Sequence, residues 1–394
     1  MKRTLSTLSI TVLTALGMLL TPMQSSAAEA PFIFGLLMVG PANDHGWSQA
    51  HFEAGKAVER HIAGTRMIYI DKVNPADRPG VTVPFLVNDL VSKGAQLIIG
   101  NSDDMKDGIR EAAMLHPGVK FIHISGDDAK NADSPANLSN LMGKMEYGQM
   151  MAGFTAAMSS KTGKIGYVGP LINDETKRLA TSCYLGARYA WTKVLKKNPA
   201  DLTFKISWIG FWFNIPGVTS DPTQVSKNFF HSGADVVISG IDTTEALIVA
   251  DQKKKEGADV AAIPYDFQGA CEAAPAACLG VPYFNWVPGY THFINAAKTG
   301  NWKKEWLWLG PDWSDMSNLQ TSSINFLNGS ALSPQAAAAL KAFSVGLGDG
   351  SINLFSGPLH FQDKSVFLKA GETANESQIW NLPQLLEGML GASK

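Results

Sequence analysis

Short, continuous runs of apolar residues alternate along the chain with longer segments in which apolar residues recur at helical spacing. The apolar runs form two series of four, at 32–39, 67–70, 96–100 and 119–124, and then at 164–168, 202–209, 234–239 and 260–264. The segments with helical spacing lie at 47–61, 83–93, 106–115, 148–159, 175–196, 223–232 and 244–255. Val- and Ile-rich runs joined by helices are typical of parallel sheets covered on both faces. The pattern therefore predicts an α/β protein.

The two series resemble each other, which predicts two similar lobes. Lys93–Ile99 and Ser232–Ile238 each combine the end of a helix, a glycine that ends it and the start of a strand, at corresponding places in the two series. In open α/β sheets, ligands bind beyond the carboxyl ends of the strands. Two lobes that face each other at those ends form a cleft.

Polar and aromatic residues follow nearly every predicted strand. Those that we predict to contact a ligand are Asn43, Asp44, Trp47, Asp103, Asp104, Phe211, Trp212, Phe213, Asp242, Asp266, Asn285 and Trp286. Most of them also have a simpler explanation, because Asn and Asp are common helix N-caps and Trp is often buried by packing alone. Since the same residue types recur at the same edge of both lobes, we favour a shared ligand site.

The chemistry of these loops suits an uncharged, flat ring that carries hydroxyl groups. Aromatic side chains stack on flat bases, and each contributes about 1–3 kcal/mol. Asp carboxylates accept hydrogen bonds from hydroxyls, and such charge-assisted bonds are strong. The loops carry few Lys or Arg residues, which disfavours a phosphate or a free carboxylate as the ligand.

Residues 1–28 have the three parts of a secretory signal peptide. Lys2 and Arg3 precede the apolar stretch 5–20, and small residues follow at 25–28. A membrane span needs about 20 mostly apolar residues, and this stretch is diluted by Ser and Thr. The first cysteine is Cys183, so no lipid is expected at the mature N-terminus. We predict a periplasmic protein with no membrane anchor.

The composition removes several other classes of function. The 394 residues are 45% hydrophobic and 17% charged, with a formal net charge of -2, which excludes a mainly disordered chain and disfavours a nucleic-acid binder.

Cys271 and Cys278 bracket a short loop, and in an oxidising compartment that spacing predicts a disulfide. Cys183 is expected to be a buried apolar residue. The eight His residues form no cluster with metal-ligand spacing, so no metal site or cofactor is expected.

Four segments resemble motifs of the basic membrane protein (BMP) family, which consists of substrate-binding proteins of ABC transporters and includes purine-nucleoside receptors. Gly40–His51 resembles the family's opening motif, and Gly233–Val237 resembles a second block. Phe355–Leu359, followed by Gln362–Lys364, is similar to its C-terminal Gly-Pro hairpin. Ile379–Gly388 is similar to its closing helix. The resemblance covers essentially the whole chain after the signal peptide.

The resemblance implies a type I periplasmic-binding-protein fold. In that fold two doubly wound parallel-sheet lobes are joined by three crossovers, with the ligand cleft between them. The boundaries that we expect are a signal peptide at 1–28, an N-terminal lobe at 29–142 plus 288–314, a C-terminal lobe at 143–280 plus 322–394, a first crossover near 142–146 and further hinge crossovers at 281–287 and 315–321.

The resemblance also implies roles for individual residues. Asp44 and Trp47 match first-loop positions that contact ligand, Asp266 matches the ribose-binding Asp, and Asp242 and the aromatics at 211–213 align with other parts of the site. It implies a monomer that binds a purine nucleoside without chemistry and delivers it to an ABC permease by hinge closure.

Three alternatives stay open from the sequence. The same fold could bind a sugar or another small heterocycle. The chain could be an exported nucleoside or glycoside hydrolase, for which the acid pairs Asp103–Asp104 and Asp127–Asp128 are candidates. Finally, its partner could be a chemoreceptor or a sensor kinase instead of a permease.

Overall fold

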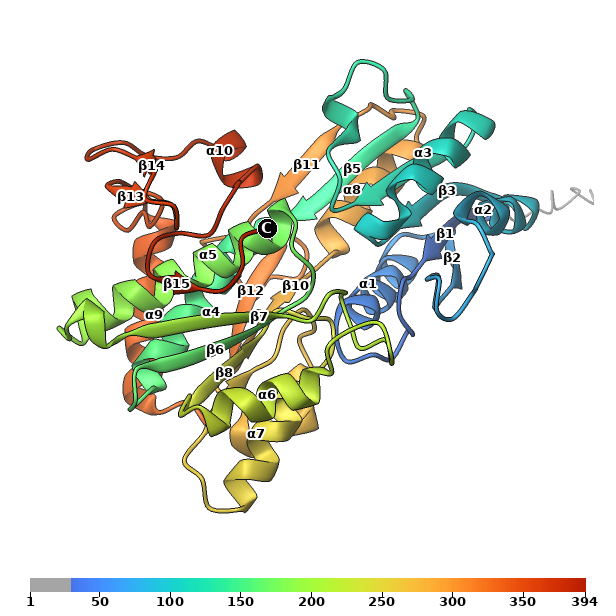
Figure 1. The fold of residues 1–394 in the computed structure, drawn as a ribbon. Coiled ribbons are helices and arrows are strands. Elements are labelled where there is room, and N and C mark those ends of the chain that lie inside the picture. The colour runs from blue at the N-terminus through green and yellow to red at the C-terminus, as the bar shows by residue number, and fades with distance from the viewer. Residues whose placement is uncertain (1–29) are drawn as a thin grey trace, which may run out of the picture. The chain divides into compact units, whose positions relative to one another are not determined.

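The structure, a computed structural model, describes residues 30–394, and two parallel sheets organise its secondary structure (Figure 1). The predicted signal peptide at 1–28 lies outside the described residues. Among residues 30–394, no helix has the length and apolar character that crossing a membrane requires.

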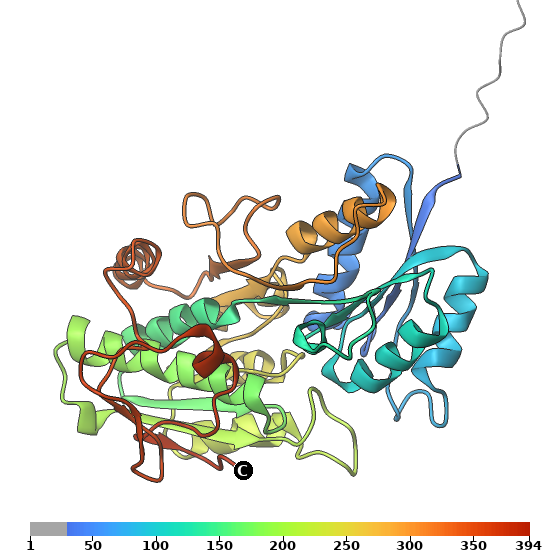
Figure 2. The same ribbon diagram turned by 90° about the horizontal axis from the view of Figure 1, so that it is seen from above.

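The first sheet has six strands, all parallel. Their spatial order is β11 (Trp306–Leu309), β5 (Leu138–Gly143), β4 (Lys120–Ile124), β3 (Ala95–Gly100), β1 (Phe32–Leu37) and β2 (Thr65–Ile70). Figure 2 shows two pairs of helices on opposite faces of this sheet, namely α1 (Trp47–His61) with α8 (Val287–Lys298), and α2 (Val83–Ser92) with α3 (Lys106–Leu115). Burial on both faces explains the largely apolar runs of the central strands β1 and β3.

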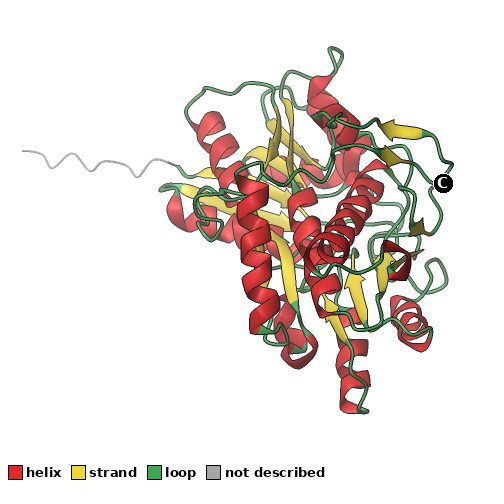
Figure 3. Ribbon diagram, turned by 90° about the vertical axis from the view of Figure 1, so that its left-hand side faces the viewer, coloured by secondary structure: helices red, strands yellow, loops and turns green. Residues whose placement is uncertain are grey.

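The second sheet has five strands, also all parallel. Their order is β15 (Met389–Leu390), β7 (Thr203–Trp208), β6 (Lys164–Gly169), β8 (Val236–Ser239) and β9 (Ala261–Ile263). Helices again cover both faces (Figure 1), with α4 (Met145–Ser159) and α5 (Asp174–Tyr189) on one side and α6 (Pro222–His231) and α7 (Glu245–Lys255) on the other. Figure 3, coloured by secondary structure, shows helices packed around the strands. Helix α9 (Pro334–Gly348) packs on α4.

The chain passes between the two sheets after β5, after β10 (Gly280–Phe284) and after β11. Strand β10 pairs with β12 (Ile324–Asn328) in an antiparallel ladder. The Asn285 side chain joins the second and third of these passages, because its amide donates to the carbonyls of Leu319 at 2.8 Å and Ser322 at 2.7 Å. The lobe boundaries given above stay a prediction.

The C-terminal segment contains one departure from expectation. A hairpin of β13 (Leu359–His360) and β14 (Val366–Leu368) comes first. The helix expected over 379–388 is wrong, because helix α10 spans only Glu376–Trp380 and the chain continues to β15 at the edge of the five-stranded sheet. Pro383 accounts for the early end, since proline lacks an N–H and disfavours helical geometry in the residue before it.

Several single turns complete the structure. Helix α5 ends at Tyr189, earlier than the segment 175–196 predicted, and a π-helical turn follows it at once. The short turns are η1 (Asp103–Met105), η2 (Asp128–Lys130), the π-helical η3 (Ala190–Val194), η4 (Pro199–Asp201), η5 (Ala270–Ala273) and η6 (Pro275–Ala277). A disulfide with an S–S distance of 2.07 Å joins Cys271 to Cys278, and Cys183 is a buried free thiol.

Candidate functional site

A small cavity lies where loops from the carboxyl ends of both sheets meet. Its volume is about 20 Å³, which is room for about one water molecule. The residues that line it are Val39, Trp47, Ser102, Asp103, Ser125, Glu175, Trp212, Asp242 and Tyr265. The first five of these residues, from Val39 to Ser125, come after strands of the six-stranded sheet. The last four, from Glu175 to Tyr265, come after strands of the five-stranded sheet. The structure therefore brings together Trp47, Asp103, Trp212 and Asp242 of the predicted set.

Trp47 is held rigidly at the cavity wall. Its ring is 7% exposed, and its Nε1 donates to the carbonyl of Asn101 at 2.6 Å. The ring of Trp286 meets it edge-on at 5.2 Å, and His51 lies stacked on Trp286 at 4.2 Å. Trp47 thus takes part in both core packing and the cavity. Trp286, which is 2% exposed, only supports it from behind.

The loops of the two sheets touch directly beside the cavity. A Cβ added to Gly46, in the loop after β1, would stand 1.7 Å from the carbonyl oxygen of Asp242, in the loop after β8. Only glycine permits such a close approach of two backbones. The amide of Asp242 also donates to the carbonyl of Trp212 at 2.9 Å, which links two of the lining residues.

Asp44 acts as a helix cap at the start of α1. Its carboxylate accepts from the backbone N–H groups of Gly46, Ser48 and Gln49, each at 2.9 Å. Burial raises the pKa of Asp44, and these hydrogen bonds offset part of the rise. The capping explanation therefore describes Asp44 in this structure, although it stays within electrostatic reach of Asp242.

Asp266 is the most unusual of the predicted residues. It is 0% exposed, and neither carboxylate oxygen has a well-formed hydrogen bond among the described residues. Burial raises the pKa of Asp266 well above its usual range, and the nearby carboxyls of Asp242, Asp44 and Glu175 raise it further. Its backbone has φ 71°, a left-handed conformation that Asp tolerates better than most residues. Strain together with an unsatisfied buried acid is typical of functional sites.

The backbone of Asp266 is held in that conformation by strand β10. Its N–H donates to the carbonyl of Pro282 at 3.1 Å, and its own carbonyl accepts from Phe284 at 3.1 Å. Its neighbour Tyr265 lines the cavity. The sequence thus positions Asp266 behind the cavity wall, on a loop anchored to a strand between the two sheets.

Glu175 is a cavity residue that the sequence reasoning missed. It stands in the first turn of α5, directly after the loop that follows β6, and is 7% exposed. Burial raises its pKa to about 7, and the neighbouring carboxyl of Asp103 adds to the effect. The position of this loop at the carboxyl end of a strand was the only available signal.

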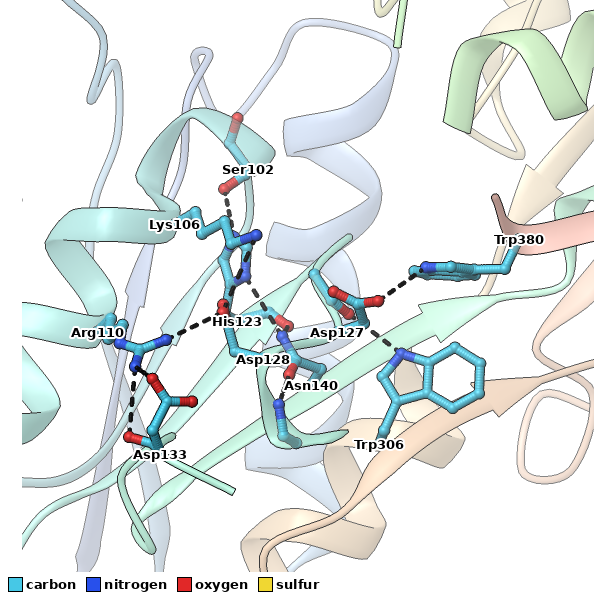
Figure 4. A network of polar contacts seen from close by, with 12 residues as sticks. Ser102, Lys106, Arg110, His123, Asp127, Asp128, Asp133, Asn140, Trp306 and Trp380 are labelled. Carbon is cyan, nitrogen blue, oxygen red and sulfur yellow. Dashed lines mark hydrogen bonds and ion pairs between the residues drawn. The ribbon is translucent and has the colours of Figure 1, made fainter. Parts of the chain in front are cut away.

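A network under the loop after β4 fixes two further parts of the cavity wall (Figure 4). His123 Nε2 donates to the carbonyl of the lining residue Ser102 at 2.9 Å, and its Nδ1 faces the amide of Asn140 at 3.3 Å. Burial lowers the pKa of His123, which keeps the ring neutral and suits this pattern of one donor and one acceptor. The lining residue Ser125, with φ 73°, follows on the same loop.

The same loop contacts the C-terminal segment. Trp380 Nε1 donates to the Asp127 carboxylate at 3.2 Å (Figure 4), and its ring meets Trp306 edge-on at 4.9 Å. The Lys130 ammonium lies 3.3 Å from the centre of the Trp306 ring, a cation–π arrangement. Helix α10, which packs on α5, is thereby joined to the six-stranded sheet.

The remaining predicted residues do not line this cavity. Asn43 and Asp104 are exposed, and Asn285 and Trp286 have the structural contacts described above. Phe211 and Phe213 meet edge-on at 5.1 Å on the loop that carries Trp212. Within residues 30–394, no group of His, Cys, Asp and Glu is arranged to hold a metal ion.

Comparisons with known proteins agree with this geometry. The profile of the Bmp family, described as ABC transporter substrate-binding protein PnrA-like, matches residues 33–310. A purine-binding protein of Brucella abortus is 27% identical over 366 residues, which cover 92% of this chain and 94% of that protein.

Solved structures share the fold. A solute-binding protein of an ABC transporter system from Aeropyrum pernix K1 superposes with a TM-score of 0.65 at 12% identity, covering 91% of this chain and 100% of that one. Another, from Conexibacter woesei, has a TM-score of 0.60 at 16% identity and covers 82% and 98%. Both the predicted α/β fold class and the family resemblance are confirmed. The chain belongs to the Bmp family of PnrA-like ABC transporter substrate-binding proteins and has the type I periplasmic-binding-protein fold.

Proposed function

We propose that this protein binds a purine nucleoside between its two groups of loops and delivers it to an ABC permease. The observation that carries the proposal is the pairing of Trp47 and Trp212, from loops of different sheets, in one cavity with carboxyl groups from both sides. Two aromatic faces suit the base, and the carboxyls suit the ribose hydroxyls. The name of the Brucella abortus relative points to the same ligand class.

Binding requires the two groups of loops to move apart. A cavity of about 20 Å³ is far too small for a nucleoside, so a ligand enters only when the loops separate. A ligand that contacts both groups favours the form in which they close on it, because its affinity for that form is higher. The closed form then presents both lobes to the permease. We propose that this happens in the periplasm, after removal of a signal peptide at 1–28.

Calorimetry against a panel of nucleosides, nucleobases and sugars tests the ligand class. We expect a purine nucleoside to bind with a Kd near or below the micromolar range, about −8 kcal/mol, and free sugars to bind far more weakly. Incubation with inosine should release no ribose, because the protein acts by binding alone. Preference for a sugar, binding to no purine compound, or release of ribose would each contradict the proposal.

A further inference from the structure

The polar groups that line the cavity are dominated by acids. They are the carboxyls of Asp103, Glu175 and Asp242 together with the hydroxyls of two serines and a tyrosine. Among the described lining residues, none is Lys, Arg or His. A ligand must therefore meet these carboxyls with its own donors, or else meet them in a protonated form that can donate.

Glu175 differs from the other acids in what surrounds it. The helix start does not need it as a cap, because Asn173 and Thr176 already form a reciprocal capping box there. The cation that acts on Glu175 is Arg178, and its Nε donates to Glu146 at 2.7 Å. The charged and titratable groups that act on Glu175 or respond to it are Asp103, Glu146, Arg178, Asp242, Asp266, Tyr167 and Tyr265.

This setting makes the proton of Glu175 available near neutral pH. Burial and neighbouring acids raise its pKa to about 7, while Arg178 and the Ser125 hydroxyl limit the rise. At that pH the empty protein contains both forms of Glu175. The neutral acid offers one donor beside one acceptor, whereas the carboxylate offers two acceptors.

We propose that Glu175 is a specificity-determining residue of this cleft. It forms hydrogen bonds with the edge of the purine base, and the base that it favours changes when Glu175 gains or loses its proton. This inference rests on the proposed function. The edges of adenosine and inosine each combine one donor with one acceptor, and they match the neutral acid. Guanosine has the same N1–H and O6 as inosine and adds a donor at its 2-amino group, so it can also present two donors side by side, and that edge matches the carboxylate.

Calorimetry with adenosine, inosine and guanosine at about pH 6 and about pH 8 tests the proposal. Adenosine and inosine should bind about tenfold more weakly at the higher pH, because the neutral acid that they require is lost there. Guanosine should keep or gain affinity at the higher pH, because its N1 and 2-amino donors then meet the carboxylate. Asp103 and Asp242 line the same cavity, so a Glu175 variant is needed to assign the change of preference to Glu175.

Two variants separate this role from a merely structural one. Glu175→Gln keeps one donor and one acceptor, so it should bind adenosine at both pH values and lose the reversal. Asp174→Asn, on the same turn, changes an exposed carboxylate that pairs with Lys177 at 2.9 Å, and it should keep the reversal. The same pH trend for adenosine and guanosine, or a reversal that persists in Glu175→Gln, would overturn the inference alone. If no nucleoside binds at either pH, the proposed function itself fails.

Discussion

Replacing Arg178 with methionine is expected to lower the free energy of unfolding by about 3–5 kcal/mol. Arg178 is 2% exposed, its Nε donates to Glu146 Oε1 at 2.7 Å, and its guanidinium lies 4.1 Å from the centre of the Trp380 ring. Without it, the buried Glu146 carboxylate loses its hydrogen-bonded counter-charge and keeps only the weaker attraction of Lys144, which is paired with Glu376. Removing one partner of a buried ion pair is costly because the other charge stays buried. Chemical denaturation of the empty protein measures the change.

The defect should also depend on pH in a defined direction. Burial already raises the pKa of Glu146, and loss of Arg178 would raise it further. A carboxyl whose pKa is higher in the folded state destabilises that state as pH rises above the unfolded pKa. The Arg178→Met variant should therefore be least impaired in acid, where Glu146 is protonated, and most impaired above neutral pH.

Two comparisons control the Arg178 experiment. Arg188→Met changes an exposed residue of the same helix and should alter stability by less than about 0.5 kcal/mol. Combining Arg178→Met with Glu146→Leu removes both charges and should recover much of the loss. A single variant as stable as the parent, or an effect that is equal in acid and in base, would show that this pair does not stabilise the fold in this way.

Asp266→Asn is expected to weaken nucleoside binding by about 2 kcal/mol, or roughly 30-fold in Kd. Asparagine tolerates the left-handed backbone of this position but loses the acceptor pair that we assign to ribose hydroxyls. The empty variant should be as stable as the parent in acid, and more stable as the pH rises above about 4, the unfolded-state pKa of Asp. The reason is that ionisation of Asp266 against burial and three neighbouring acids destabilises the folded state as pH rises.

Calorimetry for binding and denaturation of the empty protein measure these two effects separately. Asp259→Asn is the matched control, because Asp259 precedes the same strand, β9, at its opposite end and is exposed in an ion pair with Lys161. It should bind nucleosides like the parent. An Asp266→Asn variant with unchanged affinity, or one that loses stability when empty, would mark Asp266 as a structural residue.

Local pattern was enough to predict most of the fold, and the exceptions have physical causes. Strands β1, β3, β6 and β8 were visible because burial on both faces makes them largely apolar. Strand β5 was not predicted because Ser139 and Asn140 interrupt its apolar pattern. Both polar side chains are buried, where they accept hydrogen bonds from the backbone N–H groups of Glu305 and Ala129. Strand β11 is half-buried and β15 has only two residues, so neither produces a strong periodic signal.

The candidate site was predictable only to the level of the loops. Loops at the carboxyl ends of strands are recognisable from order alone, which is why the predicted set includes the cavity-lining residues Trp47, Asp103, Trp212 and Asp242. Glu175 was missed because an acid in the first turn of a helix is ordinary and is favoured by the helix dipole. Its burial beside Asp103, which follows a strand of the other sheet, depends on residues far apart in the chain, and local sequence pattern does not reveal it. Trp286 shows the opposite case, since a loop tryptophan gives no local sign that it will pack behind the site.

A crystal structure of the protein with bound adenosine tests the central claim most directly. We expect the purine ring between Trp47 and Trp212, the ribose hydroxyls near Asp266, and loops of both sheets in contact with one ligand molecule. A nucleoside bound to one sheet alone, or bound away from these loops, would contradict the claim that the two lobes grip a purine nucleoside together.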